Sequence, residues 1–526
     1  MNVSSLALIN ADVVTLDPRQ PKAQAIYVEG DRIVAVGTNE TVKRCITEKT
    51  NVCNAKGASV VPGLVDCHVH MTSFGKSLIR LDLSGARSIS DLQHRLSRYA
   101  RRIPNGSWVV GRGWDQERFT ERRYPTREDL DAAVEDKPVL VVRVCGHVGT
   151  ANTEALRLAR ISRMTVVDGG ETQLDSEGQL NGVLKENALE EIYRAIPKLS
   201  NDELERTLRF ACSRAVRSGL TCVHWLVDSP EEFRALQHMR ARNELPLRVY
   251  LGISGGLLNE LVGIGLETGF GDSMLRIGFI KFFADGSLGA RTAALEKPYE
   301  DDRKNVGILL LSQKRLNELV QRAHDAGFQI GVHAIGDRAI CSVVRAYAKA
   351  LKNNPRDDHR HRVEHCSVLD RGLINALSSL EVVASIQPHF VVSDTWVKSR
   401  VGKERARMVY PIKTLTREGV LVISGSDCPI ESISPLFGIW AATSQQPFAG
   451  ENLTVKEALE TYTTNAAKAS FDEHERGIIK PGYLADFTML SKSLFDVPPE
   501  EIRDIDVEMT IVGGRIVYSR GSYDSH

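Results

Sequence analysis

Two histidines separated by one residue stand at the end of an apolar run early in the chain. His68 and His70 lie in the segment PGLVDCHVHM. On an extended strand, residues two apart point to the same side, so both imidazoles could bind one divalent metal ion. Histidine pairs with this spacing also occur as ordinary surface or core residues. The pair therefore indicates a metal site only if other ligands join it.

Three further residues with metal-binding side chains each follow an apolar run later in the chain. His333 lies in GVHAIGD, His365 in RVEHC and Asp427 in ISGSDCP. Taken singly, Asp427 is typical of a turn or a helix N-cap. Residues at the carboxyl ends of parallel barrel strands, however, meet at one face of the barrel. We therefore expect these side chains to surround a metal centre together with the histidine pair.

Lys281 is surrounded by isoleucine and phenylalanine in the segment GFIKFFADG. A bare ammonium group is costly to bury, and burial lowers the pKa of an amine. A neutral lysine can capture carbon dioxide as a carbamate, an anion able to bridge two metal ions. The alternative is a lysine whose ammonium group reaches past the strand end into water.

Eight apolar runs, several of them ending at these residues, could be the strands that position the site. Eight is the number of strands in a (β/α)8 barrel. The runs are SVVPGLVD near Val60, GLTCVHWL from Gly219, LRVYLGI from Leu247, RIGFIKFF from Arg276, FQIGVHA from Phe328, HRVEHC from His361, EVVASIQP from Glu381 and VLVISGSD from Val420.

Amphipathic helices separate many of these runs. The helix beginning at Ser200 has Glu203 as the partner of a capping box and ends at Gly219, and a second helix ends at Gly327. Glycine-terminated helices that lead into apolar strands occur in barrels and in doubly wound sheets. The spacing by itself does not distinguish these two folds.

The chain ends have a different pattern from the middle. Short β-rich runs with turns fill the segments 1–61 and 472–526, which predicts one small β domain made from both ends. The barrel would then occupy 62–471, with an inserted subdomain at about 75–195 after the first strand. The predicted fold class is α/β: a TIM-like barrel with this insertion and a small β-sandwich domain formed by the two termini.

Composition argues against several classes of partner. The 67 basic residues equal the 67 acidic residues, so the chain lacks the basic excess of a nucleic-acid-binding protein. No uncharged apolar run approaches the roughly 20 residues of a membrane-spanning helix, and the first residues do not resemble a signal peptide. The nine cysteines form no CxxC pair. We expect a cytoplasmic protein that acts on a small molecule.

The motifs taken together resemble those of the amidohydrolase superfamily, and most closely the branch that includes N-substituted formamide deformylase. The resemblance spans essentially the whole chain. It is carried by PGLVDCHVHM, FIKFFADGSLGARTAAL, GVHAIGDRA, RVEHC, SGSDCPI, TTNAAKA and GIIKPGYLADFTML. This resemblance favours the barrel over the doubly wound sheet.

The resemblance also implies roles for the candidate ligands. His68, His70 and Asp427 would bind the more buried of two zinc ions, and His333 and His365 the other. Carboxylated Lys281 would bridge the two ions. Asp427 would also be the catalytic acid and base. Relatives of this family are commonly dimers or larger, so the resemblance implies a homo-oligomer such as a dimer.

The implied reaction is hydrolysis of a non-peptide C–N bond in an amide-like small molecule, with an N-substituted amide or formamide favoured. The first alternative is a deaminase or cyclic amidohydrolase on the same scaffold, which a single ion and an unmodified Lys281 would favour. The second alternative is an inactive metal-binding regulatory protein. All the ligand positions are filled in this sequence, which argues against an inactive protein.

Four residues are candidates for substrate contact, each with a plainer alternative: Trp114 in GRGWDQERF, His147 in CGHVGTAN, His224 in VHWL and Arg291 in DGSLGARTA. Trp114 could equally be a hydrophobic anchor, and His147 a structural histidine. Core packing is the simpler role for His224. An ion pair within a glycine-rich loop is the simpler role for Arg291.

Overall fold

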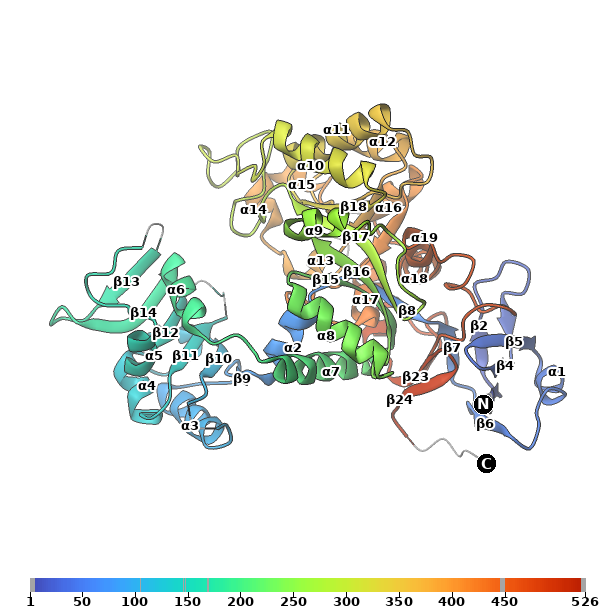
Figure 1. The fold of residues 1–526 in the computed structure, drawn as a ribbon, viewed down its shortest axis with the longest axis horizontal. Coiled ribbons are helices and arrows are strands. Elements are labelled where there is room, and N and C mark those ends of the chain that lie inside the picture. The colour runs from blue at the N-terminus through green and yellow to red at the C-terminus, as the bar shows by residue number, and fades with distance from the viewer. Residues whose placement is uncertain are drawn as a thin grey trace. The chain divides into compact units, whose positions relative to one another are not determined.

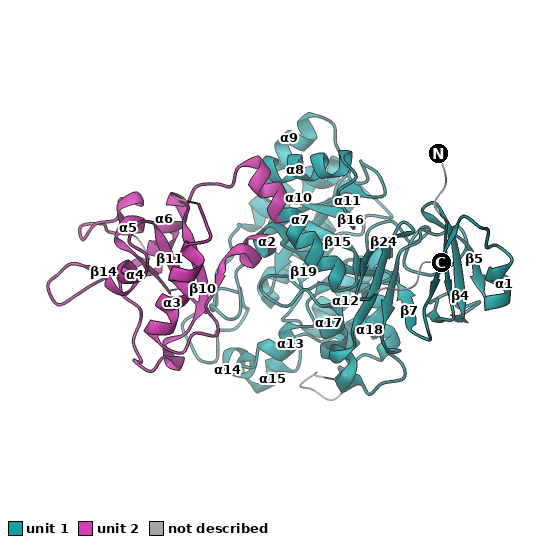
Figure 2. Cartoon of the chain, turned by 90° about the horizontal axis from the view of Figure 1, so that it is seen from below, with its two compact units in different colours: residues 1–74, 208–526 teal, residues 75–207 magenta. Residues whose placement is uncertain are grey.

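The structure is a computed structural model that describes residues 5–104, 106–144, 146, 148–167, 170–444 and 450–521. The chain divides into two compact units, one made of 1–74 and 208–526 and the other of 75–207 (Figure 2). The larger unit contains all the candidate metal ligands named above. The smaller unit contains Trp114.

Eight parallel strands form a nearly closed barrel in the larger unit (Figure 1). Their order in the sheet follows their order in the sequence, which confirms the barrel and excludes a doubly wound sheet. The strands are β8 (Leu64–Val69), β15 (Leu220–Val227), β16 (Arg248–Ser254), β17 (Leu275–Phe283), β18 (Gln329–Ala334), β19 (Arg362–His365), β20 (Val383–Ile386) and β21 (Val422–Ser424).

The segment that follows β21 joins the last strand to the first. The backbone N–H of Asp427 donates to the carbonyl oxygen of His68 at 2.8 Å, and that of His70 donates to the carbonyl of Cys428 at 2.9 Å. Gly425 makes this close approach possible, because a Cβ at its position would lie 2.5 Å from the backbone nitrogen of His68. The two motifs with candidate metal ligands, at opposite ends of the barrel sequence, are thereby neighbours.

Helices connect the barrel strands, and the predicted start and stop signals are present. At the start of α7, the backbone N–H of Ser200 donates to Glu203 at 2.9 Å and the N–H of Glu203 donates back to the Ser200 hydroxyl at 3.4 Å. The principal helices are α7 (Asn201–Arg217), α8 (Pro230–Ala241), α10 (Gln313–Asp325), α11 (Asp337–Asn353), α12 (Arg371–Ser379), α16 (Ile412–Arg417), α17 (Pro435–Ser444), α18 (Val455–Thr461) and α19 (Thr464–Ala469).

The first predicted barrel strand, SVVPGLVD, is two strands in two different sheets. β7 (Ser59–Pro62) pairs with a strand from the C-terminal segment, and only β8 belongs to the barrel. Gly63 separates them, and a Cβ there would lie 2.2 Å from the hydroxyl oxygen of Thr221. The chain can therefore pass tightly against β15 as it leaves one sheet and enters the next.

Strands from both chain ends pair within one sheet. In this sheet β22 (Phe487–Leu490) runs antiparallel to β7. The other strands of the sheet are β2 (Asp12–Val14), β3 (Lys22–Ala23), β23 (Val507–Val512) and β24 (Arg515–Ser519). A second sheet contains β1 (Ser5–Ile9), β4 (Ala25–Glu29), β5 (Arg32–Gly37) and β6 (Thr50–Asn54). Both sheets contribute to one buried apolar cluster that includes Leu8, Ile26, Phe487 and Ile511. The assignment of the two sheets as a sandwich domain stays a prediction.

The smaller unit has its own sheet, with helices on both faces. The strands are β9 (Leu81–Asp82), β10 (Val109–Trp114), β11 (Val139–Arg143), β12 (Val148–Ala151), β13 (Gly170–Leu174) and β14 (Leu180–Glu186), and the helices are α3 (Ile89–Ala100), α4 (Arg127–Ala133), α5 (Thr153–Leu158) and α6 (Asn187–Ala195). Apolar residues of the sheet belong to two separate buried clusters, one with α3 and α4 and one with α5 and α6.

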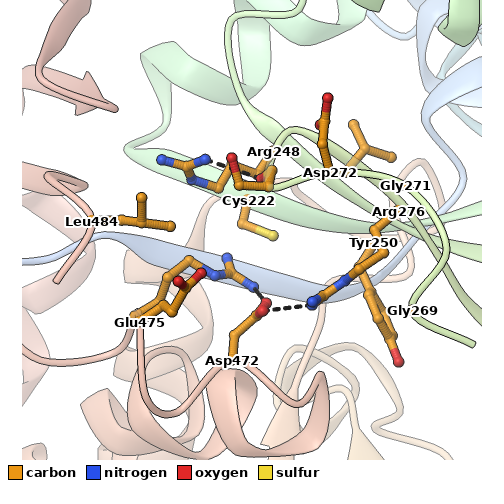
Figure 3. Close-up of a pocket in the computed structure, with 13 residues that line it drawn as sticks. Cys222, Arg248, Tyr250, Gly269, Gly271, Asp272, Arg276, Asp472, Glu475 and Leu484 are labelled. Carbon is orange, nitrogen blue, oxygen red and sulfur yellow. Dashed lines mark hydrogen bonds and ion pairs between the residues drawn. The ribbon is translucent and has the colours of Figure 1, made fainter. Parts of the chain in front are cut away.

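Ion pairs link the amino ends of the barrel strands to the C-terminal segment. Arg248 at the start of β16 donates two hydrogen bonds to the carboxylate of Asp486, at 2.7 and 2.9 Å. Arg276 near the start of β17 lies 2.6 Å from Asp472, beside a cavity of about 230 Å³ (Figure 3). Since these guanidinium groups already have carboxylate partners, the simplest role of this cluster is structural.

Among the residues that the structure describes, none of the helices combines the length and the apolar character needed to span a lipid bilayer.

Candidate metal centre

The two histidines of the HxH motif lie at the carboxyl end of β8, as the sequence indicated. His68 is fully buried, whereas the His70 side chain is 27% exposed. The two imidazole rings are 5.7 Å apart between centroids. Both therefore belong to one site, with His70 on its more open side.

The Asp427 carboxylate lies beside this pair. Its Oδ1 atom is 3.2 Å from His70 Nε2 and 3.5 Å from His68 Nε2. The backbone of Asp427 is in the left-handed region, with φ of 57°, an uncommon conformation for a residue other than glycine. Burial alone would raise the pKa of Asp427, but the neighbouring imidazoles outweigh burial and hold that pKa below its usual range.

His333 and His365 approach the same site from β18 and β19. Their ring centroids are 4.5 Å apart, and the His365 ring lies 4.9 Å from the ring of His68. His365 Nδ1 lies 2.6 Å from the amide oxygen of Gln387. The oxygen can only accept, so Nδ1 carries the proton and Nε2 has a lone pair available for a metal. His333 Nε2 lies 3.0 Å from the carbonyl oxygen of Gly286.

Burial keeps these imidazoles neutral. It lowers the pKa of His68, lowers that of His333 to about 4, and places that of His365 well below its ordinary value. A neutral imidazole has the free lone pair that a metal ligand needs. The protonation states expected near pH 7 therefore suit metal binding.

Lys281 is buried in β17 and is only 3% exposed. Its Nζ atom is 4.5 Å from the centre of the Phe283 ring and has no hydrogen-bond partner among the described residues. Burial lowers the pKa of this amine. Lys281 thus does not reach past the strand end into water, which was the alternative considered from the sequence.

Unsatisfied polar atoms converge at this site. One candidate ligand atom from each of His68, His365 and Asp427 lies within 4.8 Å of the others. His68 Nε2 and Asp427 Oδ1 are buried and, among the described residues, have no hydrogen-bond partner of acceptable geometry. Buried polar atoms are rarely left unpaired, because each costs free energy. A divalent metal ion fits this set of imidazole and carboxylate donors.

Other buried polar groups contact these candidate ligands and were not among the residues predicted from the sequence. Glu364 accepts a hydrogen bond from His68 at 2.5 Å, and Arg362 donates to Glu364 at 2.6 Å. Arg362 and Glu364 are two residues apart on a strand, so their side chains share a face. Two opposite charges on one face of an otherwise apolar run are unusual, and this pattern in the sequence could have indicated both residues. Gln387, a polar residue directly after β20, is a comparable signal.

The structure describes three of the four candidate substrate residues. Trp114 is fully buried in the apolar cluster of the smaller unit, against Phe119 and Tyr124, which supports its role as an anchor. His224 is also fully buried, and its Nδ1 accepts from Arg362 at 2.9 Å. Arg291 lies 3.0 Å from Asp301, the ion pair considered as its plainer role. His147 lies outside the described residues.

Comparison with known proteins assigns the family. The sequence profile described as the amidohydrolase family matches residues 51–518. The chain belongs to the amidohydrolase family. This amidohydrolase is 33% identical to the protein YtcJ from Bacillus subtilis (strain 168), over 97% of this chain and 98% of that protein. It is 28% identical to the N-substituted formamide deformylase of Arthrobacter pascens, over 98% of each chain.

A solved structure supports the same family assignment. The crystal structure of an uncharacterized metal-dependent hydrolase from Pyrococcus furiosus aligns with a TM-score of 0.82 and 31% identity, covering 94% of this amidohydrolase and 100% of that chain. The family and its named relatives support hydrolase activity.

Proposed function

We propose that this amidohydrolase is a metal-dependent hydrolase that cleaves a C–N bond outside peptides, with an N-substituted amide or formamide as substrate. The observation that carries the proposal is the convergence of buried, unsatisfied ligand atoms at the carboxyl end of the barrel. The similarity to N-substituted formamide deformylase supports the substrate class.

The proposal assigns the candidate ligands to two ions. His68, His70 and Asp427 would hold one divalent ion, with zinc favoured, and His333 and His365 would hold a second. Lys281, buried and without a hydrogen-bond partner among the described residues, would bridge them as a carbamate formed with carbon dioxide. When bound, such ions lower the pKa of water to near neutrality and polarise the substrate carbonyl.

Asp427 supplies the proton transfers in this proposal. Its carboxylate accepts the proton that water loses as the water oxygen bonds to the carbonyl carbon. The same carboxyl then donates that proton to the nitrogen as the C–N bond breaks. The products are a carboxylic acid, which is formic acid for a formamide, and an amine. General base and general acid roles of this kind contribute about 10²- to 10⁴-fold to rate.

Two measurements test the proposal. Metal analysis of the purified protein should find about two divalent ions per chain, and a panel of N-substituted formamides, amides and lactams should contain a substrate. A single ion with an unmodified Lys281, together with activity on aminopurines instead, would favour a deaminase.

The Asp427→Asn variant tests the proton transfers separately from metal binding. Its turnover should fall by about 10²- to 10⁴-fold while metal content is largely retained, because the asparagine oxygen can still act as a ligand. Asp506→Asn, a change at a carboxylate that is 54% exposed and pairs with Arg520, is the control and should leave turnover unchanged. Wild-type turnover in a fully metal-loaded Asp427→Asn protein would refute the role of Asp427.

A further inference from the structure

A buried pair of opposite charges lies directly beneath the candidate metal centre. Arg362 and Glu364 on β19 are both 0% exposed. Arg362 Nε donates to Glu364 Oε1 at 2.6 Å, and Arg362 also donates to Glu364 Oε2 at 3.1 Å. The same Oε2 atom is 2.5 Å from His68 Nδ1. The carboxylate thus connects the arginine to a candidate metal ligand.

Arg362 is held in place by three other barrel strands. It donates to the carbonyl oxygen of Cys67 on β8 at 2.7 Å, to the hydroxyl of Ser385 on β20 at 3.0 Å and to Nδ1 of His224 on β15 at 2.9 Å. Its guanidinium group also lies 4.2 Å from the centre of the Phe279 ring on β17. A side chain fixed by so many strands gives Glu364 a rigid support.

This geometry determines the tautomer of His68. An ionised carboxylate can only accept hydrogen bonds, so the proton of the neutral His68 ring is on Nδ1. The lone pair is then on Nε2, the atom that lies 3.5 Å from Asp427 Oδ1 and has no hydrogen-bond partner among the described residues. A ring with the other tautomer would present an N–H to the metal centre and could not bind an ion there.

We propose that Glu364, supported by Arg362, is a positioning residue that fixes the ring orientation and tautomer of His68 for metal binding. This inference rests on the metal binding of the proposed function, and it does not depend on which bond the enzyme cleaves. Partners of this kind typically change metal affinity by about 10- to 100-fold when they are removed.

In the described part of the chain, a second buried ion pair in the same unit has no contact with a candidate metal ligand and serves as a comparison. Arg248 and Asp486 have side chains 3% and 6% exposed, and the guanidinium group donates to both carboxylate oxygens. The same carboxylate also accepts a hydrogen bond from the backbone N–H of Gly513 at 2.8 Å. Glu364 differs because its second carboxylate oxygen also contacts an imidazole that the metal centre needs.

The test compares Glu364→Gln and Glu364→Asp with wild type, using Asp486→Asn as the matched control. Zinc affinity is measured on full-length metal-free protein by competition with a chromophoric chelator. Both Glu364 variants should bind zinc about 10- to 100-fold more weakly. Asp486→Asn should lower the temperature of unfolding and leave zinc affinity unchanged, because it weakens a comparable pair that does not contact a ligand.

Nuclear magnetic resonance of isotope-labelled histidine provides a readout that a merely structural role would not change. In wild type, with or without zinc, His68 should give a strongly hydrogen-bonded Nδ1–H signal, which Glu364→Asp should shift or lose. If Glu364→Gln does not fold because Arg362 loses its counter-ion, Glu364→Asp, which retains the charge, decides the question.

The outcomes separate the two proposals. Wild-type zinc affinity and an unchanged His68 signal in the folded variants would overturn the positioning role of Glu364. Wild-type protein that binds no divalent ion would instead refute the proposed function, and the His68 signal of metal-free protein would still report on Glu364.

Discussion

Replacing Gly425 by alanine should weaken the metal centre without changing any of its ligands. A Cβ at this position would lie 2.5 Å from the backbone nitrogen of His68, 2.8 Å from the His68 Cβ and 2.9 Å from Asp66 Oδ1. None of these atoms is the end of a flexible side chain on the surface, since His68 and Asp66 are both buried. The added methyl group must therefore push β8 and the segment after β21 apart.

The size of the effect follows from these distances. Ordinary contacts of this kind are about 3.5–4.0 Å, so the two segments must separate by about 1 Å. Overpacking of a buried site typically costs about 1–3 kcal/mol. If most of that cost falls on the arrangement of His68 and Asp427, zinc affinity should fall by about 5- to 150-fold.

The assay is zinc competition with a chelator, combined with thermal unfolding of the metal-free protein. Gly263→Ala is the control, because a Cβ at Gly263 has nothing within 4 Å. We expect the control to bind zinc like wild type. Gly425→Ala protein that is folded and binds zinc with wild-type affinity would show that close contact between the segments does not position the ligands.

Three further predictions concern stability. His361, whose Nδ1 accepts from the N–H of Ile330, has a pKa well below its ordinary value because of burial. Below about pH 6.5 the unfolded chain therefore binds more protons than the folded chain. The free energy of unfolding should then decrease as the pH is lowered, by up to about 1.4 kcal/mol per pH unit for this group. Chemical denaturation at several pH values should show a shallower acid loss in His361→Gln. Asp285 accepts three backbone N–H groups, so Asp285→Asn should cost about 1–3 kcal/mol, visible as a lower unfolding temperature. Trp114→Ala should destabilise the smaller unit by about 3–5 kcal/mol, measured by hydrogen exchange within 75–207, while metal content stays at the wild-type value because the candidate ligands all belong to the other unit.

The strands of the barrel were predictable because their signal is local. Each of the eight runs is apolar enough to be buried on both faces, and several are preceded by a helix that ends at glycine. The candidate ligands were also visible, because histidine, lysine and aspartate are conspicuous where an apolar run ends. These patterns lie within a few residues of one another in the sequence, so no knowledge of distant contacts is needed to find them.

Other features depended on contacts between distant parts of the chain. The run at Ser59 was divided between two sheets because β7 finds its partner in the C-terminal segment, more than 400 residues later. Glu364 contacts the candidate ligand His68, which is 296 residues away in the sequence. His224, which the sequence pattern placed at the end of a strand, lies within β15 and is buried against Arg362. Local sequence patterns describe which residues are apolar and where strands end. A hydrogen bond between separate strands depends instead on the register of the strands and on which side chains share the barrel interior. Only the folded chain specifies the register and the neighbouring side chains.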